Sequence, residues 1–201
     1  DLFGVKLTPA WARRNTPEVA ACDYQGKRRD DQAWQLAPAL FEAIDSDARF
    51  GGIAGHEVDM FADADNWQLP VFWSRWRCRG SAGLDAFAQD WADKRLFANP
   101  PFVLIARVVA EARRREVAIT LVCQWDPQQL WWPVVQPDAP EAVAWRRVPA
   151  DARNYLVEGE PLLRAPKADV YVVRLDFTLQ RQECSLRAAA LRRMQAAQRR
   201  R

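Results

Sequence analysis

The chain has 201 residues, 49% of them hydrophobic, and a formal net charge of +3. This length supports one substantial core with short appendages and argues against two full domains. So small a net charge excludes a strongly basic protein and does not by itself indicate a nucleic-acid partner. Basic residues nevertheless gather in short clusters at residues 13–14, 27–29, 113–115, 146–147 and 192–201. Each cluster has two interpretations, a solvated surface or a contact with nucleic acid.

Several kinds of chemistry are poorly supported by the residue types present. His56 is the single histidine, so Ser–His or Cys–His catalysis and multi-histidine metal sites are not expected. The four cysteines are widely separated, which argues against a zinc or redox motif and predicts buried or idle thiols. The sequence has no apolar run long enough to span a bilayer and no signal pattern. We therefore expect an intracellular fragment of a longer chain, without a metal or a membrane contact.

The first third of the chain predicts a linker followed by a helix and a strand. Residues 1–32 contain a short alternating segment, residues 5–7, and then become polar and charged. Pro38 suits a first helical turn, and Leu40, Phe41 and Ile44 place apolar groups on one face of a helix ending near residues 51–52. Residues 57–62 predict a short strand, residues 66–79 are rich in tryptophan and arginine, and residues 80–83 predict a loop.

Residues 95–123 predict a parallel crossover unit. The apolar run at residues 96–98 predicts a strand, which must end at the two following prolines because they cannot donate ladder hydrogen bonds. Residues 103–111 have helical apolar spacing, and residues 117–123 predict a strand covered on both faces. Strand, loop, helix and strand form a parallel crossover. Open parallel sheets bind ligands beyond the carboxyl ends of their strands, and Asn99 lies at such an end.

The last third of the chain predicts one further strand and a basic tail. After Trp132 the sequence is punctuated by prolines to about Pro149, and residues 170–177 then alternate as a strand does. Residues 181–201 are helical in composition and rich in arginine. The predicted organisation is therefore an α/β domain at residues 33–180, with a linker segment at 1–32 before it and a basic helical tail at 181–201 after it.

The four residues Asn99, Pro100, Pro101 and Phe102 carry the candidate chemistry. An adenine amino group is a poor nucleophile because its lone pair is delocalised, and two hydrogen-bond acceptors would localise that pair. The side-chain oxygen of Asn99 and the carbonyl of Pro100 can be those acceptors. The prolines hold both in place, and Phe102 can stack on a base swung out of its helix. The alternative is a simple strand-terminating turn with Phe102 packed in the core.

A wider resemblance covers roughly residues 34–135. It is carried by residues 34–38 (WQLAP), 57–62 (EVDMFA), Asn66, Asp85, Trp91, residues 97–102 (FANPPF) and the tryptophan-rich residues 125–132. This order resembles the phage-type DNA adenine-N6 methyltransferase domain. It is more closely similar to the methyltransferase-like region that follows reverse transcriptase and ribonuclease H in DIRS-like tyrosine-recombinase retrotransposons. The resemblance implies a partial Rossmann-like methyltransferase sheet with flanking helices, and DNA as the favoured nucleic-acid partner.

The N-terminal residues support the retrotransposon version of this resemblance. Residues 14–16 (RNT) and 22–27 (CDYQGK) look like the closing segment of such a ribonuclease H. Asp23 would then match its last metal-binding carboxylate, although Gly26 replaces the usual serine and the other carboxylates would lie upstream. A complete ribonuclease site is therefore not expected, and Asp23 as an exposed linker acid is the alternative. The resemblance implies other polyprotein domains as partners and a nuclear or cytoplasmic location.

The resemblance also implies S-adenosylmethionine as the cofactor, with Pro38, Asp59, Phe61 and Asp85 as its binding residues. A carboxylate at a strand end can accept hydrogen bonds from ribose hydroxyls. The glycine-rich turn usual after the first strand of methyltransferases is absent, and residues 63–66 (DADN) stand there instead. Asp59 and Asp85 as surface or capping acids remain the alternative.

The implied function is therefore a DNA adenine-N6 methyltransferase-like domain of a retroelement polyprotein, with or without catalysis. A non-catalytic nucleic-acid-binding or scaffold module is the alternative. The tryptophans have two interpretations as well, core packing or stacking on bases.

Overall fold

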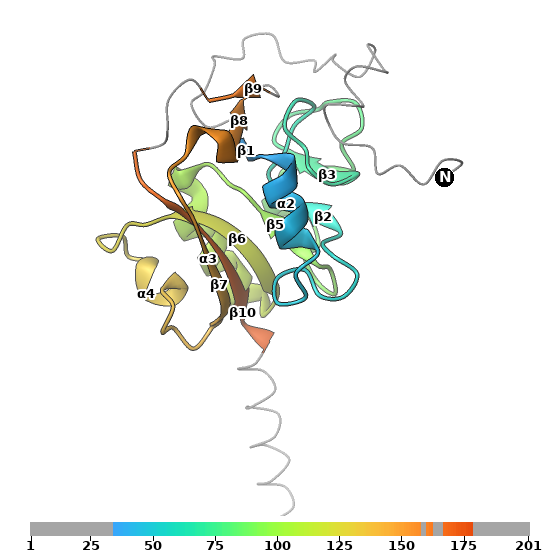
Figure 1. Ribbon diagram of the computed structural model, residues 1–201. Helices are drawn as coiled ribbons and strands as arrows, with labels where there is room; N and C mark the ends of the chain where they lie inside the picture. The colour runs from blue at the N-terminus through green and yellow to red at the C-terminus, as the bar shows by residue number, and fades with distance from the viewer. Residues whose placement is uncertain (1–33, 158–159, 163–166, 179–201) are drawn as a thin grey trace, which may run out of the picture.

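The computed structural model describes residues 34–157, 160–162 and 167–178. A large sheet contains the strands β2 (Val58–Asp59), β3 (Val71–Ser74), β4 (Gly83–Leu84), β5 (Leu96–Ala98), β6 (Ala118–Gln124), β7 (Ala142–Val148) and β10 (Val170–Asp176). A small sheet contains β1 (Trp34–Leu36), β8 (Tyr155–Val157) and β9 (Glu160–Pro161). The small sheet lies beyond the end of β5 and β6, beside the start of the first described helix (Figure 1).

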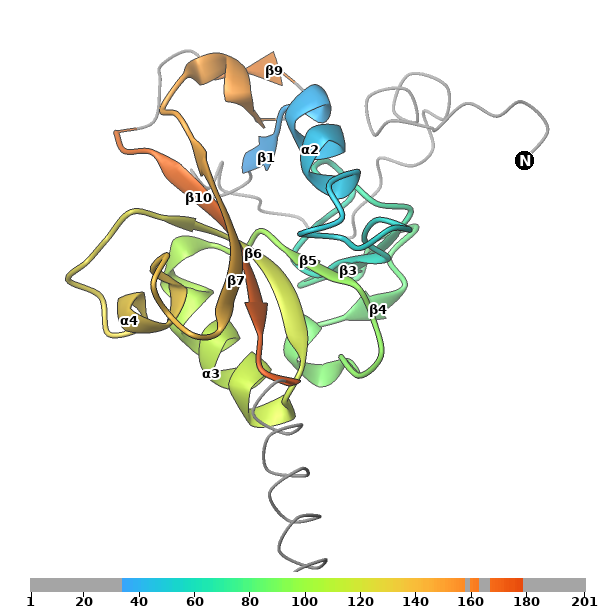
Figure 2. The same ribbon diagram turned by 60° about the horizontal axis from the view of Figure 1, so that its bottom comes forward.

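Two helices cover opposite faces of the large sheet. These are α2 (Pro38–Asp45) and α3 (Ile105–Arg115), and the view in Figure 2 shows the sheet between them. The remaining helical segments are short: α4 (Trp132–Val135) and the 3₁₀ turns η2 (Ala86–Ala88), η3 (Phe102–Leu104) and η4 (Ala152–Asn154). The α2 helix begins with Pro38, whose fixed φ and missing N–H suit a first turn.

The large sheet has the order β4-β3-β2-β5-β6-β10-β7. Its first five strands are parallel, and β10 runs antiparallel to both of its neighbours. The predicted crossover unit is confirmed, because β5 and β6 are parallel neighbours joined through η3 and α3. The chain is therefore an α/β protein with a mostly parallel sheet.

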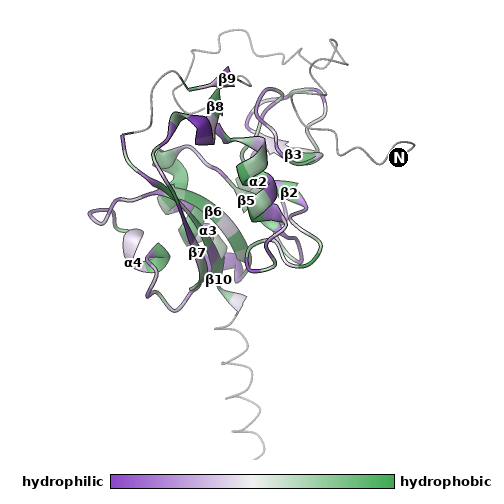
Figure 3. Cartoon of the chain, viewed as in Figure 1, coloured by the Kyte–Doolittle hydropathy of each residue, from purple (hydrophilic) through white to green (hydrophobic). Residues whose placement is uncertain are grey.

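The core is divided between the two faces of this sheet. On one face, the α3 residues Ile105, Val108, Val109 and Ala112 are buried against alternate residues of β5, β6 and β10. On the other, the α2 residues Phe41 and Ile44 are buried in a second cluster that includes Phe97. Hydrophobic residues accordingly dominate the central strands (Figure 3). Both faces of β5 are therefore sealed, and only its carboxyl end is left for a ligand.

Several predicted boundaries were wrong. The helix predicted to end near residues 51–52 ends at Asp45, because Ser46 caps it with its hydroxyl on the Glu42 carbonyl at 2.7 Å. The strand predicted at residues 57–62 is only β2, because the chain turns away after Asp59. The strands β3, β4 and β7 of the large sheet and the three strands of the small sheet were not predicted. The β7 strand is a partly exposed edge strand, so its sequence lacks the apolar run that marks a central strand.

Some predictions lie outside the described residues. The linker at residues 1–32, with Asp23 and Gly26, and the basic tail at 181–201 are among them. Within the described part of the chain, no helix is long and apolar enough to cross a membrane. Of the four cysteines, Cys78 and Cys123 are described, and both are buried free thiols, as predicted.

Candidate functional site

The segment Asn99–Phe102 lies at the carboxyl end of β5, between the ends of β2 and β6. All three residues of β5 are buried, and the strand pairs in parallel with both neighbours. The ladder stops at the prolines, which have no N–H group to donate. The chain then turns directly through η3 into α3. The sequence pattern thus placed this segment correctly at a strand end of the sheet.

The side chain of Asn99 is oriented by one hydrogen bond. Its Nδ2 donates to the backbone carbonyl of Trp34, in β1, at 2.8 Å. The bond uses the donor end of the amide, and Oδ1 makes no hydrogen bond to any residue that the structure describes. Oδ1 is an acceptor with two lone pairs. Asn99 is half-buried, so this acceptor sits at the edge of the apolar interior.

A pocket opens beside Asn99. It is lined by the segment itself, by all of β1 and by single residues of β6, β8 and β10: Trp34, Gln35, Leu36, Asn99, Pro100, Pro101, Phe102, Val122, Tyr155 and Val170. Three aromatic rings meet around it. Trp34 packs edge-on against Phe102, with ring centroids 6.2 Å apart, and lies 5.9 Å from Tyr155 at a tilt.

The chemistry of this pocket is that of an apolar slot with an amide at its rim. Burial raises the pKa of Tyr155, so its phenol stays neutral. No charged side chain is among the described residues that line the pocket, which favours a flat, uncharged ring that donates hydrogen bonds. The cavity is about 30 Å³, which is room for a few water molecules rather than a nucleobase. A base would enter only if Trp34 or Phe102 moved.

Asp59 ends β2, one strand away from Asn99. Its side chain is buried, and its carboxylate accepts hydrogen bonds from the backbone N–H of Gln68, at 3.0 Å, and of Phe61. Burial raises the pKa of Asp59 to about 7, and the two N–H groups only partly oppose that rise. Asp59 does not line the pocket. The carboxylate closes the loop after β2, which is the capping role left open from the sequence.

The other predicted cofactor residues lie on the far side of Asp59. Asp85 follows β4 and caps η2 by accepting from the Phe87 N–H at 3.0 Å. Phe61 packs edge-on against Phe87, with centroids 5.6 Å apart, so the structure brings Phe61 to the Asp85 loop. Pro38 is instead exposed at the start of α2. Apart from Pro38, the predicted residues therefore form two groups, one around Asn99 and one around Asp85, with Asp59 between them.

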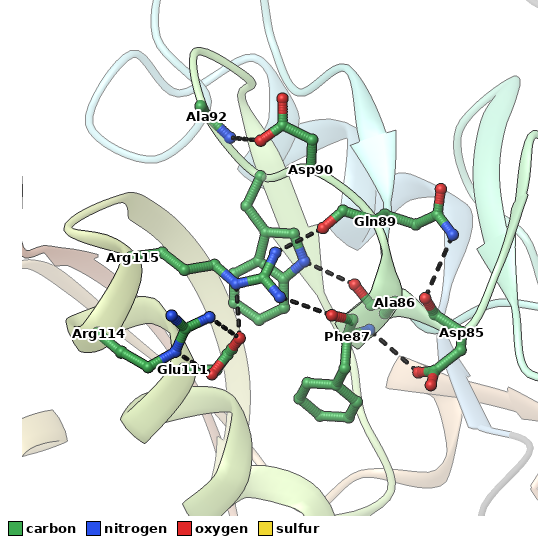
Figure 4. Close-up of polar contacts among 10 residues, drawn as sticks. Asp85, Ala86, Phe87, Gln89, Asp90, Ala92, Glu111, Arg114 and Arg115 are labelled. Carbon is green, nitrogen blue, oxygen red and sulfur yellow. Dashed lines mark hydrogen bonds and ion pairs between the residues drawn. The ribbon is translucent and has the colours of Figure 1, made fainter.

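A polar network ties the Asp85 loop to α3 (Figure 4). Arg115 donates to the carbonyls of Phe87 and Gln89, pairs with Glu111 at 2.6 Å and stacks on Trp91. The indole of Trp91 in turn donates to the Ala86 carbonyl at 2.6 Å. The adjacent guanidinium groups of Arg114 and Arg115 hold the pKa of Glu111 down, at about 2. This network determines where Asp85 lies.

Sequence reasoning missed the residues that come from distant parts of the chain. Tyr155 forms a wall of the pocket only because β1 pairs with β8. The paired residues are 119 apart in the chain for Leu36–Tyr155 and 123 apart for Trp34–Val157. Arg115 was predicted only as part of the basic cluster at residues 113–115, which does not reveal its contacts with the Asp85 loop. No local pattern signals either role.

The fold and the site define an α/β protein whose candidate ligand site lies at the carboxyl end of a mostly parallel sheet. The chain matches no protein-family model, and comparison with curated proteins and with solved structures gives no significant similarity. Among the described residues, no group of three or more histidine, cysteine or acidic side chains is arranged to hold a metal. The site must therefore be interpreted from its own geometry.

Proposed function

We propose that this chain is a methyltransferase-like domain of a retroelement polyprotein, acting on adenine N6 in DNA with S-adenosylmethionine as methyl donor. One observation carries the proposal. Asn99 stands at the end of β5 with its Nδ2 held by the Trp34 carbonyl, which leaves Oδ1 as a free acceptor beside an aromatic pocket. That is the arrangement required to accept a hydrogen bond from a ring amino group.

The strand order supports a nucleotide-type ligand. Numbered along the chain within the large sheet, the strands run 3-2-1-4-5 before the antiparallel strand, which is the beginning of the doubly wound order. The strand order reverses between β2 and β5, so the connections that follow these two neighbouring strands run over opposite faces of the sheet. Ligands of doubly wound sheets bind at this switch point. Asp59 ends one of the two strands that flank this point, and Asn99 follows the other.

In the proposed complex, the adenine amino group donates to Asn99 Oδ1 and to the Pro100 carbonyl. Accepting both amino hydrogens localises the nitrogen lone pair and directs it toward the methyl donor. Phe102 stacks on the base, which has to leave its helix to enter the pocket. Entry requires Trp34 or Phe102 to move, because the pocket is only about 30 Å³.

S-adenosylmethionine fits the Asp85 side of this sheet edge better than the end of β2. The carboxylate of Asp85 and the rings of Phe61 and Phe87 offer an acceptor and an apolar wall for its adenosine group. Asp59 is occupied by two backbone N–H groups, so its contribution is to shape the loop between β2 and β3. When bound, the cofactor supplies an electrophilic methyl group; the residues of this chain orient the base that receives it.

The test combines calorimetric titration of the cofactor with methyl transfer to DNA, for wild type and Asn99→Ala. We expect the wild type to bind the cofactor and transfer methyl groups. Asn99→Ala should reduce the transfer rate by about 100-fold, the usual cost of one acceptor or donor at a reacting centre. Gln128→Ala, which removes an exposed amide, is the matched control and should transfer at the wild-type rate. Absence of both binding and transfer in the wild type would exclude catalysis.

A second function is favoured by the polar groups near the proposed cofactor site, which already form hydrogen bonds within the chain. The carboxylate of Asp59 is already occupied, and the turn after β2 is closed by internal hydrogen bonds of Asp63, Asp65 and Asn66. These features suit a non-catalytic nucleic-acid-binding or scaffold module. It predicts salt-dependent DNA binding that Asn99→Ala leaves unchanged and that is lost when residues 181–201 are removed.

A further inference from the structure

The loop after β3 presents arginines and a tryptophan to solvent. We call residues 75–79, with the sequence Arg-Trp-Arg-Cys-Arg, the arginine loop. Arg75, Trp76, Arg77 and Arg79 are exposed, and the guanidinium of Arg75 lies 4.8 Å from the centre of the Trp76 ring. Cys78 is buried in a small cluster with Phe72 of β3, which anchors the loop to the sheet. The loop is thus a fixed basic surface rather than a free segment.

The charges on Arg75 and Arg77 are not neutralised by a described carboxylate, unlike those on seven other arginines. Ion pairs with carboxylates are made by Arg49, Arg95, Arg113, Arg114, Arg115, Arg147 and Arg153. Neither Arg75 nor Arg77 forms such a pair with any residue in the described part of the chain. An exposed guanidinium without an internal carboxylate is available for an external anion, and its planar donors match phosphate well.

The arginine loop and Asn99 lie at the same edge of the sheet. Phe72 of β3 and Phe97 of β5 are both paired in register with Asp59 of β2, which lies between them. Arg75 is three residues beyond Phe72, and Asn99 is two beyond Phe97, both in the carboxyl direction. The two strands are two spacings apart, about 10 Å. That corresponds to about three nucleotide steps of a strand, at 3.4 Å rise per step.

From this placement we infer that the arginine loop binds the phosphodiester backbone of the DNA strand whose base enters the pocket at Asn99. The identity of this ligand rests on the function proposed above. Arg75 and Arg77 contact phosphates of the strand. The loop thereby sets the position of the strand along the sheet edge, and the pocket receives the base.

The experiment measures binding of a short fluorescein-labelled single-stranded DNA by fluorescence anisotropy over a salt series of about 50–200 mM. The variant Arg75→Gln/Arg77→Gln removes two unpaired guanidinium groups. The control Arg114→Gln/Arg153→Gln removes two guanidinium groups that are also exposed but paired with carboxylates. Both variants change the net charge equally, so only the location differs. Thermal melts of all three proteins verify folding.

We expect the loop variant to bind about tenfold more weakly and to lower the salt slope by about 1.4, or 0.7 for each lost phosphate contact. The control should stay within about twofold of the wild type. Equal effects of the two variants, or no effect of the loop variant, would overturn the inference. Cofactor titration of the wild type keeps the two proposals apart: lack of cofactor binding contradicts the proposed enzyme and leaves the anisotropy result unaffected.

Discussion

The pocket at Asn99 and the loop at Asp85 lie at the same edge of one sheet, but different forces hold them. The pocket is built from aromatic rings and one amide hydrogen bond, and none of the described residues around it is charged. The Asp85 loop depends on a guanidinium that joins two carbonyls, a carboxylate and an indole. The pocket can therefore open when one ring moves, whereas the loop can move only if several polar contacts break together.

Replacing Trp91 should break the Asp85 side most completely. Its ring is fully buried beneath Arg115, and Trp91→Ala should lower the free energy of unfolding by about 3–5 kcal/mol through the cavity it leaves. The measurement is urea denaturation. Trp76→Ala, which removes an exposed indole, is the control and should cost under about 1 kcal/mol. Equal losses would show that Trp91 is not a core element of this region.

The free energy of unfolding should depend on pH because the Asp59 side chain is buried between the two regions. Its folded pKa, about 7, lies above its ordinary value of 3.8. The folded state therefore binds more protons between these values, and stability falls as the pH rises from about 4 to about 7. Asp59→Asn removes this slope, a difference on the order of 2–4 kcal/mol at pH 8. Denaturation midpoints at several pH values test this, and parallel profiles would contradict it.

The carboxylates with lowered pKa values act in a separate window. Asp47, Glu111 and Asp151 each have a folded pKa of about 2, held there by adjacent arginines. Their contribution is present above the ordinary carboxylate pKa and is lost as the pH falls toward 2. These carboxylates therefore reduce stability only below about pH 4. The loss of stability that Asp59 causes between about pH 4 and 7 can be measured separately.

Substitutions of Arg115 should distinguish the stability contributed by its hydrogen bonds from that contributed by its positive charge. Arg115→Ala removes the bonds to the Phe87 and Gln89 carbonyls and should lower the free energy of unfolding by about 2 kcal/mol. Arg115→Lys keeps the charge without the planar fork and should recover less than half of that loss. Arg114→Ala, at an exposed pair, should cost under about 1 kcal/mol. Full recovery by lysine would contradict the locking role.

The smallest effect is expected on the pocket side. The Tyr155 hydroxyl lies 3.4 Å from the Val148 carbonyl, which makes a weak hydrogen bond. Tyr155→Phe should therefore change the free energy of unfolding by about 0.5 kcal/mol or less, because the ring supplies the stability. A loss above about 1.5 kcal/mol in chemical denaturation would show that the pocket, too, depends on polar contacts.

The sequence predicted the parts of this molecule that depend on neighbouring residues. The crossover from β5 to β6 was readable because two apolar runs flank a helix and a double proline. The end of α2 was not, since Ser46 closes the helix through a cap that competes with the apolar pattern. The edge strand β7 was missed because its side chains are only half-buried. The walls of the pocket were missed because the β1 to β8 pairing joins residues far apart in the chain.

The bond between Trp34 and Asn99 has a mechanical consequence. Because β1 has only three residues and pairs with β8, any shift of β1 moves the carbonyl that orients Asn99. Such a shift would release the amide and leave the large sheet in place, because β1 is not one of its strands. The small sheet therefore controls the orientation of Asn99 independently of the strand that carries it.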